Sequence, residues 1–106
     1  MFETIMAAPR PGIYDAALDA IIGAVAEAFK VQASEITGRR RLTEISKARM
    51  AVYTVARGRE IPPHAIMGRL SRDRSLSYYY EQTAADLIQT DRTFADRILE
   101  VEVACS

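Results

Sequence analysis

Apolar residues recur at helical spacing along most of the chain. The first series, with one apolar residue at every fourth position, is Ile13, Ala17, Ile21, Val25 and Phe29. Leu18, Ile22 and Ala28 widen this stripe, so we expect a helix that packs against more than one neighbour. Residues 31–36 predict a short helical turn, with Ser34 or a neighbouring polar residue as its start.

The middle of the chain predicts a longer helix followed by a short one. The apolar positions of the longer helix, spaced by three and four, are Ile45, Ala48, Val52 and Val55. Thr43 is a candidate N-cap, and Gly58 stands where the helix should end. Pro62 and Pro63 open the short helix, because proline is tolerated in a first helical turn.

Two more helices are predicted towards the C-terminus. The first spans roughly residues 74–89 and has Leu76, Tyr80 and Leu87 on its apolar face. The second follows Asp91 as its cap. Its apolar positions are Phe94, Ile98 and Val101.

The fold class predicted from these patterns is all-α, with about six helices in one domain. Residues 1–12, which contain Pro9, Pro11 and Gly12, show little periodicity and are expected to form a flexible arm. Residues 13–106 are expected to form the domain, because the chain has neither a repeat nor a low-complexity linker.

The charges of the chain are unevenly distributed, although they sum to zero. Its 14 basic and 14 acidic side chains give residues 1–35 a net charge of −3, residues 36–80 one of +7 and residues 81–106 one of −4. A basic block between acidic ends is typical of a protein that binds a polyanion or an acidic partner.

Composition excludes several other classes. Asp15, Asp19 and Glu27 interrupt the most apolar stretch, so no run reaches the ~18 residues of a membrane span. The N-terminal segment lacks the basic and apolar regions of a signal peptide, and Cys105 is the single cysteine, so we expect a cytoplasmic protein. No metal-ligand spacing or phosphate-binding glycine motif is present, and we expect no metal, no cofactor and no enzymatic activity.

Residues 61–85 predict a helix-turn-helix. A short helix is followed by a turn of three or four residues and then by a longer helix. In such motifs the N-terminal residues of the second helix contact base edges in the major groove of DNA. The residues at that position are Arg72, Asp73, Arg74 and Ser75. An arginine that binds guanine bidentately contributes about 1–3 kcal/mol of discrimination.

Three consecutive tyrosines lie within the second helix of this motif. Their rings point in different directions, because successive residues of a helix are ~100° apart. Tyr80 shares the face of Leu76 and Leu87 and is expected in the core, whereas Tyr78 or Tyr79 is expected to border DNA or to pack on a neighbouring helix.

Three separated elements follow one another along the chain: a basic loop, a middle helix and the start of the long helix. They are Gly38-Arg39-Arg40-Arg41, Lys47–Tyr53 (KARMAVY) and Ser71–Ser77 (SRDRSLS). In order and spacing they resemble domain IV, the C-terminal helix-turn-helix DNA-binding domain of the bacterial replication initiator DnaA. The resemblance extends over residues 18–103.

The resemblance implies a role for several residues. Arg41 would lie in a loop that reaches the minor groove or the backbone of DNA, Arg49 would project from the middle helix to a phosphate or base, and Arg72 would bind a phosphate. Asp73, Arg74 and Ser75 would face bases in the major groove. With the remaining basic residues, the candidate DNA-binding set is Arg39, Arg40, Arg41, Lys47, Arg49, Arg69, Arg72, Asp73, Arg74 and Ser75.

The chain also departs from the family pattern. At the position of the family's histidine this chain has Arg74, and at the two threonines that follow it has Ser75 and Leu76. It has Ser71 in place of the leading glycine, and Met50 in place of the glutamine that follows the arginine of the middle helix. Leu76 cannot repeat a hydroxyl contact, and arginine is longer than histidine and always charged. We therefore expect a target sequence different from that of the initiator.

The expected function is sequence-specific binding of double-stranded DNA as a transcriptional activator located on the nucleoid. Small stand-alone proteins that resemble this domain include activators of gene transfer agent genes in alphaproteobacteria, which work with a separate sigma-factor-like protein. A sigma-factor-like protein or RNA polymerase is therefore an implied partner. Two alternatives stay open: an accessory or competing protein at a replication origin, and a protein-interaction module whose basic face binds an acidic protein.

Overall fold

The computed structural model describes residues 12–106, and within this range the chain is entirely helical apart from turns and loops. The elements are α1 (Asp15–Phe29), α2 (Ala33–Ile36), α3 (Thr43–Gly58), α4 (Pro63–Arg69), the 3-10 helix η2 (Arg74–Leu76), α5 (Ser77–Thr90) and α6 (Arg92–Ala104). The prediction of an all-α domain with six helices is confirmed. The predicted arm over residues 1–12 lies, up to residue 11, outside the described residues.

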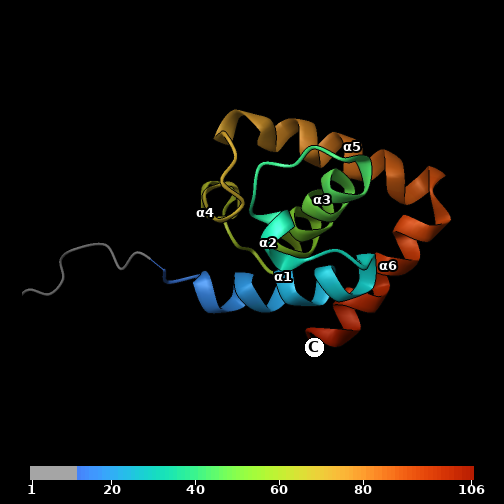
Figure 1. Cartoon of the computed structure of the whole chain (residues 1–106), viewed down its shortest axis with the longest axis horizontal. Helices are drawn as coiled ribbons and strands as arrows, with labels where there is room; N and C mark the ends of the chain where they lie inside the picture. Colours follow the sequence, from blue (N-terminus) through green and yellow to red (C-terminus); the bar gives the residue numbers. More distant parts are fainter. Residues whose placement is uncertain (1–11) are drawn as a thin grey trace, which may run out of the picture.

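The helix α3 forms the centre of the fold. Figure 1 shows α1 on one side of it and α5 on the other, with α6 closing one end, and α3 contacts all five other α-helices. More than half of its residues are buried, because neighbours cover it on nearly every side. The buried residues of α3 are Ile45, Ala48, Arg49, Met50, Ala51, Val52, Tyr53, Val55 and Ala56.

Two aromatic pairs join the outer helices to the core. The rings of Phe29 in α1 and Phe94 in α6 meet edge to face with centroids 5.9 Å apart, and the guanidinium of Arg97 lies 5.0 Å from the Phe29 centroid. Tyr53 in α3 and Tyr80 in α5 meet in the same way at 6.2 Å. The predicted core position of Tyr80 is therefore confirmed, and this contact fixes α5 against α3.

The first helix begins two residues after the start of its periodic pattern. Ile13 is 72% exposed and precedes α1, which begins at Asp15 after a turn closed by the hydrogen bond from Asp15 N to Gly12 O. Ala17 is also exposed, and the buried stripe begins only at Leu18. The periodic pattern extends one turn beyond the buried stripe, because spacing alone does not reveal where a neighbouring helix ceases to cover it.

The N-cap of α2 is a polar residue near Ser34, whereas the N-cap predicted for α3 is wrong. Gln32, not Ser34, is the N-cap of α2, and it forms a capping box in which its own backbone N–H donates to the Glu35 carboxylate at 3.0 Å. In α3 the extended residue Leu42 occupies the N-cap position, so that Thr43 is the first helical residue and its side chain caps nothing. In contrast, α3 ends at Gly58 as predicted.

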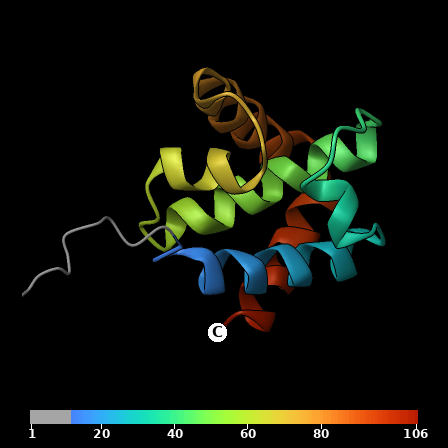
Figure 2. The ribbon, with the colours of Figure 1, turned by 60° about the vertical axis from the view of Figure 1, so that its left-hand side comes forward.

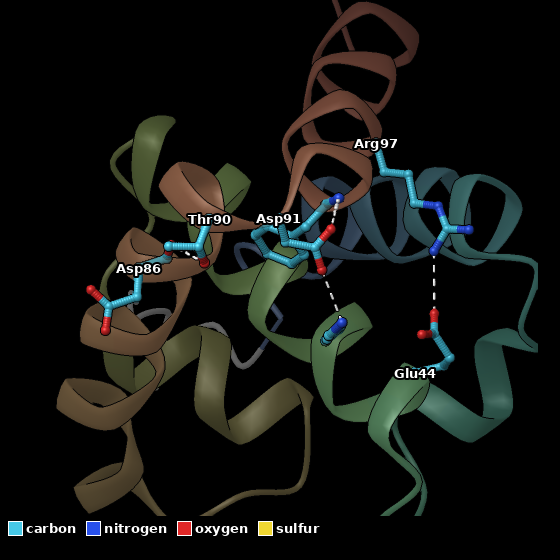
Figure 3. Close-up of polar contacts among 7 residues, drawn as sticks. Glu44, Asp86, Thr90, Asp91 and Arg97 are labelled. Atoms are coloured by element: carbon cyan, nitrogen blue, oxygen red, sulfur yellow. Dashed lines mark hydrogen bonds and ion pairs between the residues drawn. The ribbon is translucent and has the colours of Figure 1, made fainter.

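Asp91 caps α6 as predicted and also joins α6 to α3. One carboxylate oxygen accepts a hydrogen bond from Phe94 N at 3.1 Å, and the other accepts from Lys47 Nζ at 2.9 Å. Figure 3 shows this cap beside the ion pair between Arg97 and Glu44, whose closest atoms are 3.2 Å apart. Two ion pairs thus hold the start of α6 on α3.

The hydrogen bond from Lys47, together with that from Phe94 N, lowers the pKa of the Asp91 carboxyl below its ordinary value. The ionised carboxylate therefore stabilises the fold above pH ~4, the pKa of an unfolded aspartate, and this stabilisation is lost as the pH falls through the lower folded pKa. Asp91→Asn keeps a good N-cap residue but removes the charge.

We expect the free energy of unfolding to fall less steeply between pH 5 and pH 2 in Asp91→Asn than in the unmodified chain, as measured by urea denaturation. Asp86→Asn is the matched control, because its carboxylate makes no hydrogen bond within residues 12–106. An Asp91→Asn variant with the same pH dependence as the unmodified chain would contradict this role.

Candidate nucleic-acid interface

The predicted helix-turn-helix corresponds to α4, a turn over residues 70–73, η2 and α5. Ser71 adopts a left-handed conformation with φ 59°, and the backbone N–H of Arg72 donates to Met67 O at 2.9 Å. Asp73 Oδ1 then accepts from Ser75 N at 2.8 Å and caps η2. The predicted helix over 74–89 thus begins as a 3-10 turn and becomes α-helical only at Ser77.

A second segment, the basic loop of residues 38–42, lies against this turn. Gly38 O accepts hydrogen bonds from Arg49 Nη2 and from Arg72 Nη2, each at 2.9 Å. Residues 34 positions apart in the chain are thereby joined directly. A Cβ atom at residue 38 would lie 2.8 Å from Ser34 O, which is backbone and cannot move aside, so this close approach requires glycine.

Arg49 is a structural residue, and the prediction that it projects to DNA is wrong. Its side chain is 2% exposed. Besides Gly38 O, it donates from Nε to Ile36 O at 2.8 Å and from Nη2 to Glu35 O at 2.9 Å. Arg49 thus satisfies carbonyl groups at the end of α2, which have no partner within that short helix. The sequence contained an indication of this burial, because Arg49 lies close to the apolar positions Ala48 and Val52 on the predicted helix.

A groove separates the start of α3 from the start of α5. It has a volume of about 490 Å³, and its lining residues are Arg41, Ser46, Arg49, Met50, Arg72, Leu76, Tyr79 and Tyr80. Arginines from the loop, from α3 and from the turn therefore share one concave surface with two exposed apolar side chains, Leu76 and Tyr79.

These arginines affect one another electrostatically. Burial lowers the pKa of the Arg49 guanidinium below its ordinary value, and the positive charge of Arg72 lowers it further. Tyr80 acts in the opposite direction, and Arg41 adds a smaller lowering effect. Since the partners of Arg49 are neutral carbonyls, its charge is not cancelled within the described part of the chain. The groove is consequently a region of positive potential.

Lys47 and Arg69, two further predicted contacts, are not part of this groove. Lys47 is held by Asp91 on the side of α3 that packs against α6. Arg69 in α4 donates from Nε and Nη2 to Asp19 Oδ1 of α1, at 2.9 and 2.6 Å. Both side chains instead join helices. The charge pattern could not identify their partners, which are 44 and 50 residues away.

The remaining predicted residues are accessible near the groove. Arg39, Arg40 and Arg41 are exposed in the loop, although Arg40 Nη1 also forms a 3.2 Å ion pair with Glu35. Arg74 and Ser75 are exposed in η2. Asp73 is exposed as well, and the hydrogen bond from Ser75 N lowers the pKa of its carboxyl. One oxygen of its carboxylate thus caps η2 and is not free to accept a hydrogen bond from a base.

We expect Arg49→Leu to lower the free energy of unfolding by about 3 kcal/mol, because Ile36 O loses its donor and the carbonyls of Glu35 and Gly38 each lose one hydrogen bond. Urea denaturation followed by circular dichroism measures this change. Arg40→Leu is the matched control, since its side chain is 62% exposed and surface ion pairs contribute little. Similar losses in both variants would contradict the structural role of Arg49.

Comparisons with known proteins do not identify a family. No family model matches the chain, and no curated protein matches it. In the described range, no helix has the length and apolar character needed to cross a membrane, and no three potential metal-ligating side chains are clustered.

Proposed function

We propose that the protein binds double-stranded DNA through the basic loop and the α4–α5 helix-turn-helix, and that it does so as a transcriptional regulator. The observation that carries this proposal is the joining of the loop to the turn through Gly38 O. This bond gathers arginines from separate parts of the sequence beside the start of α5.

The charges of these arginines are available to a partner. No carboxylate within residues 12–106 lies within 4.0 Å of the following four side chains: Arg39, Arg41, Arg72 and Arg74. By contrast, four cations elsewhere in the fold are neutralised by ion pairs, namely Lys47, Arg59, Arg69 and Arg97. Three more cations without such pairs, Lys30, Arg57 and Arg92, are scattered over other elements. The loop and turn thus combine high positive charge with little internal neutralisation, which favours a polyanion.

The shape of this region fits duplex DNA better than a flat anionic surface. In a helix-turn-helix the second helix enters the major groove, and flanking basic residues contact the phosphates that fix its orientation. The first exposed side chains of η2 and α5 are Arg74, Ser75 and Leu76, followed by Tyr78, which is 70% exposed. Arginine and hydroxyl groups read base edges, whereas the loop arginines would contact the backbone.

The conformation of the turn adds support to the resemblance to domain IV of DnaA. Ser71 stands where the family signature has glycine, and its φ of 59° is one that glycine adopts at little cost. A single helix-turn-helix buries a modest interface, typically about 600–1,000 Å². We therefore include in the proposal a partner protein, such as a sigma-factor-like protein or RNA polymerase, that adds affinity at promoters and makes the protein an activator.

We expect the affinity for a short DNA duplex to depend steeply on salt. If the loop and turn neutralise about five phosphates, log K falls against log salt with a slope near −4.5. Fluorescence anisotropy between about 50 and 200 mM salt measures this slope. An affinity that does not change with salt would overturn the proposal, as would a stable complex with an acidic protein that excess DNA cannot displace.

Arg74→Ala and Arg41→Ala are expected to weaken binding in different ways. Loss of a base contact by Arg74 reduces the preference for the selected target over random DNA by about 10- to 100-fold, since such a contact contributes about 1–3 kcal/mol. Loss of a backbone contact by Arg41 weakens binding to both DNAs equally.

In vitro selection from random duplexes provides the target, and anisotropy with target and random DNA measures both effects. Arg92→Ala is the matched control, because it removes an exposed arginine at the start of α6, away from the groove. Equal losses on both DNAs for Arg74→Ala would contradict its assignment as a base-reading residue.

A further inference from the structure

The helix α6 has a second apolar face that the fold does not use. Its core face consists of Phe94, Ile98 and Val101, which are buried against the other helices. At ~100° per residue, positions 99 and 103 lie on the opposite side of the helix. Leu99 is 64% exposed and Val103 is 75% exposed. A helix that only covers a core would carry polar residues there.

This surface has the pattern of a helix-docking site. A shallow hollow of about 400 Å³ is lined by Asp96, Leu99, Glu100, Val103 and Ala104. The first four of these residues are spaced by three, one and three positions. We call these five residues the outer face of α6. Apolar residues at such spacing are the anchors through which one amphipathic helix binds another.

The charge of the outer face indicates the chemistry of the partner. The carboxylates of Asp96 and Glu100 lie along one side of the two apolar residues, and neither forms an ion pair within the described range. The C-terminal end of α6 adds the partial negative charge of the helix dipole. Arg92 lies one turn before Asp96, at the far end from Val103, so the hollow itself is acidic and apolar.

From this combination we propose that the outer face of α6 binds an amphipathic helix of a partner protein, with apolar residues at i and i+4 flanked by lysine or arginine. A second copy of the chain is a poor occupant. Two outer faces packed antiparallel about their centres would bring the Glu100 carboxylates together, and like charges disfavour such a contact. A cationic partner helix instead meets complementary charge along one side of its apolar stripe.

The surrounding structure supports this binding surface. The guanidinium of Arg59 at the end of α3 donates to Cys105 O at 3.1 Å and pairs with Glu102 at 3.1 Å, which fixes the last turns of α6. In Figures 1 and 2 these turns lie below α1, whereas the α4–α5 turn lies above α3. The two surfaces are thus separate, and this inference does not depend on DNA binding.

The test uses isotopically labelled protein and three short peptides as probes. The first peptide places leucines on one helical face and lysines on the other, the second has the same composition in shuffled order, and the third replaces lysine by glutamate. In two-dimensional NMR spectra, we expect the first peptide to shift the backbone signals of Asp96, Leu99, Glu100 and Val103. Equal shifts with either of the other peptides, or shifts confined to other elements, would overturn the proposal.

Two variants separate the apolar and the charged contributions. Leu99→Ser with Val103→Ser is expected to weaken binding of the first peptide at least ~10-fold, in line with the loss of two apolar anchors. Glu100→Gln is expected to weaken it less and to reduce its dependence on salt. Ile88→Ser in α5, which replaces another exposed apolar residue, is the control and should leave binding unchanged.

Two further results bear on the proposal. Unaltered affinity in the Leu99→Ser and Val103→Ser double variant would refute it. Sedimentation that shows a dimer dissociated by this double variant would also refute it, since the occupant would then be a second copy of the chain.

Discussion

The hydrogen bonds of the buried Arg49 are the interaction on which the remainder of the structure depends. Its guanidinium donates to Glu35 O, Ile36 O and Gly38 O, and so closes the end of α2 and fixes the first residue of the basic loop. Burying a charge is costly unless it is hydrogen-bonded, and here three guanidinium N–H groups donate to neutral carbonyls, which do not cancel the charge. The same contact therefore orders the loop and adds positive potential to the groove.

Although the net charge of the chain is zero, some of its cations are neutralised by ion pairs and others are not. Acidic residues from the two ends of the chain neutralise cations that lie outside the loop, such as Asp19 with Arg69 in α4 and Asp91 with Lys47 in α3. These pairs join helices that are distant in sequence. All arginines of the loop and turn except Arg40 lack a paired carboxylate within residues 12–106. Positive potential is thus concentrated by the fold and not by composition.

Predictions from the sequence were most accurate where a residue acts on its own neighbours. The cap by Asp91 and the end of α3 at Gly58 agree with the structure, because each depends on contacts a few residues away. The predictions failed where the pattern did not determine whether a side chain points into the core or towards solvent. Arg49 is such a case: on α3, which is covered on nearly all sides, a basic residue does not mark an exposed face.

The sequence by itself determined the all-helical class, the order of the helices, the turn after α4 and the core position of Tyr80, because periodicity and local caps carry that information. Only the tertiary structure decided which arginines are structural and which are accessible. It also decided that the loop meets the turn at Gly38 and that α6 retains an exposed apolar face. The hydrogen bonds of the structural arginines Arg49 and Arg69 join residues 11 to 50 positions apart, and spacing along a chain does not specify which distant group completes a hydrogen bond.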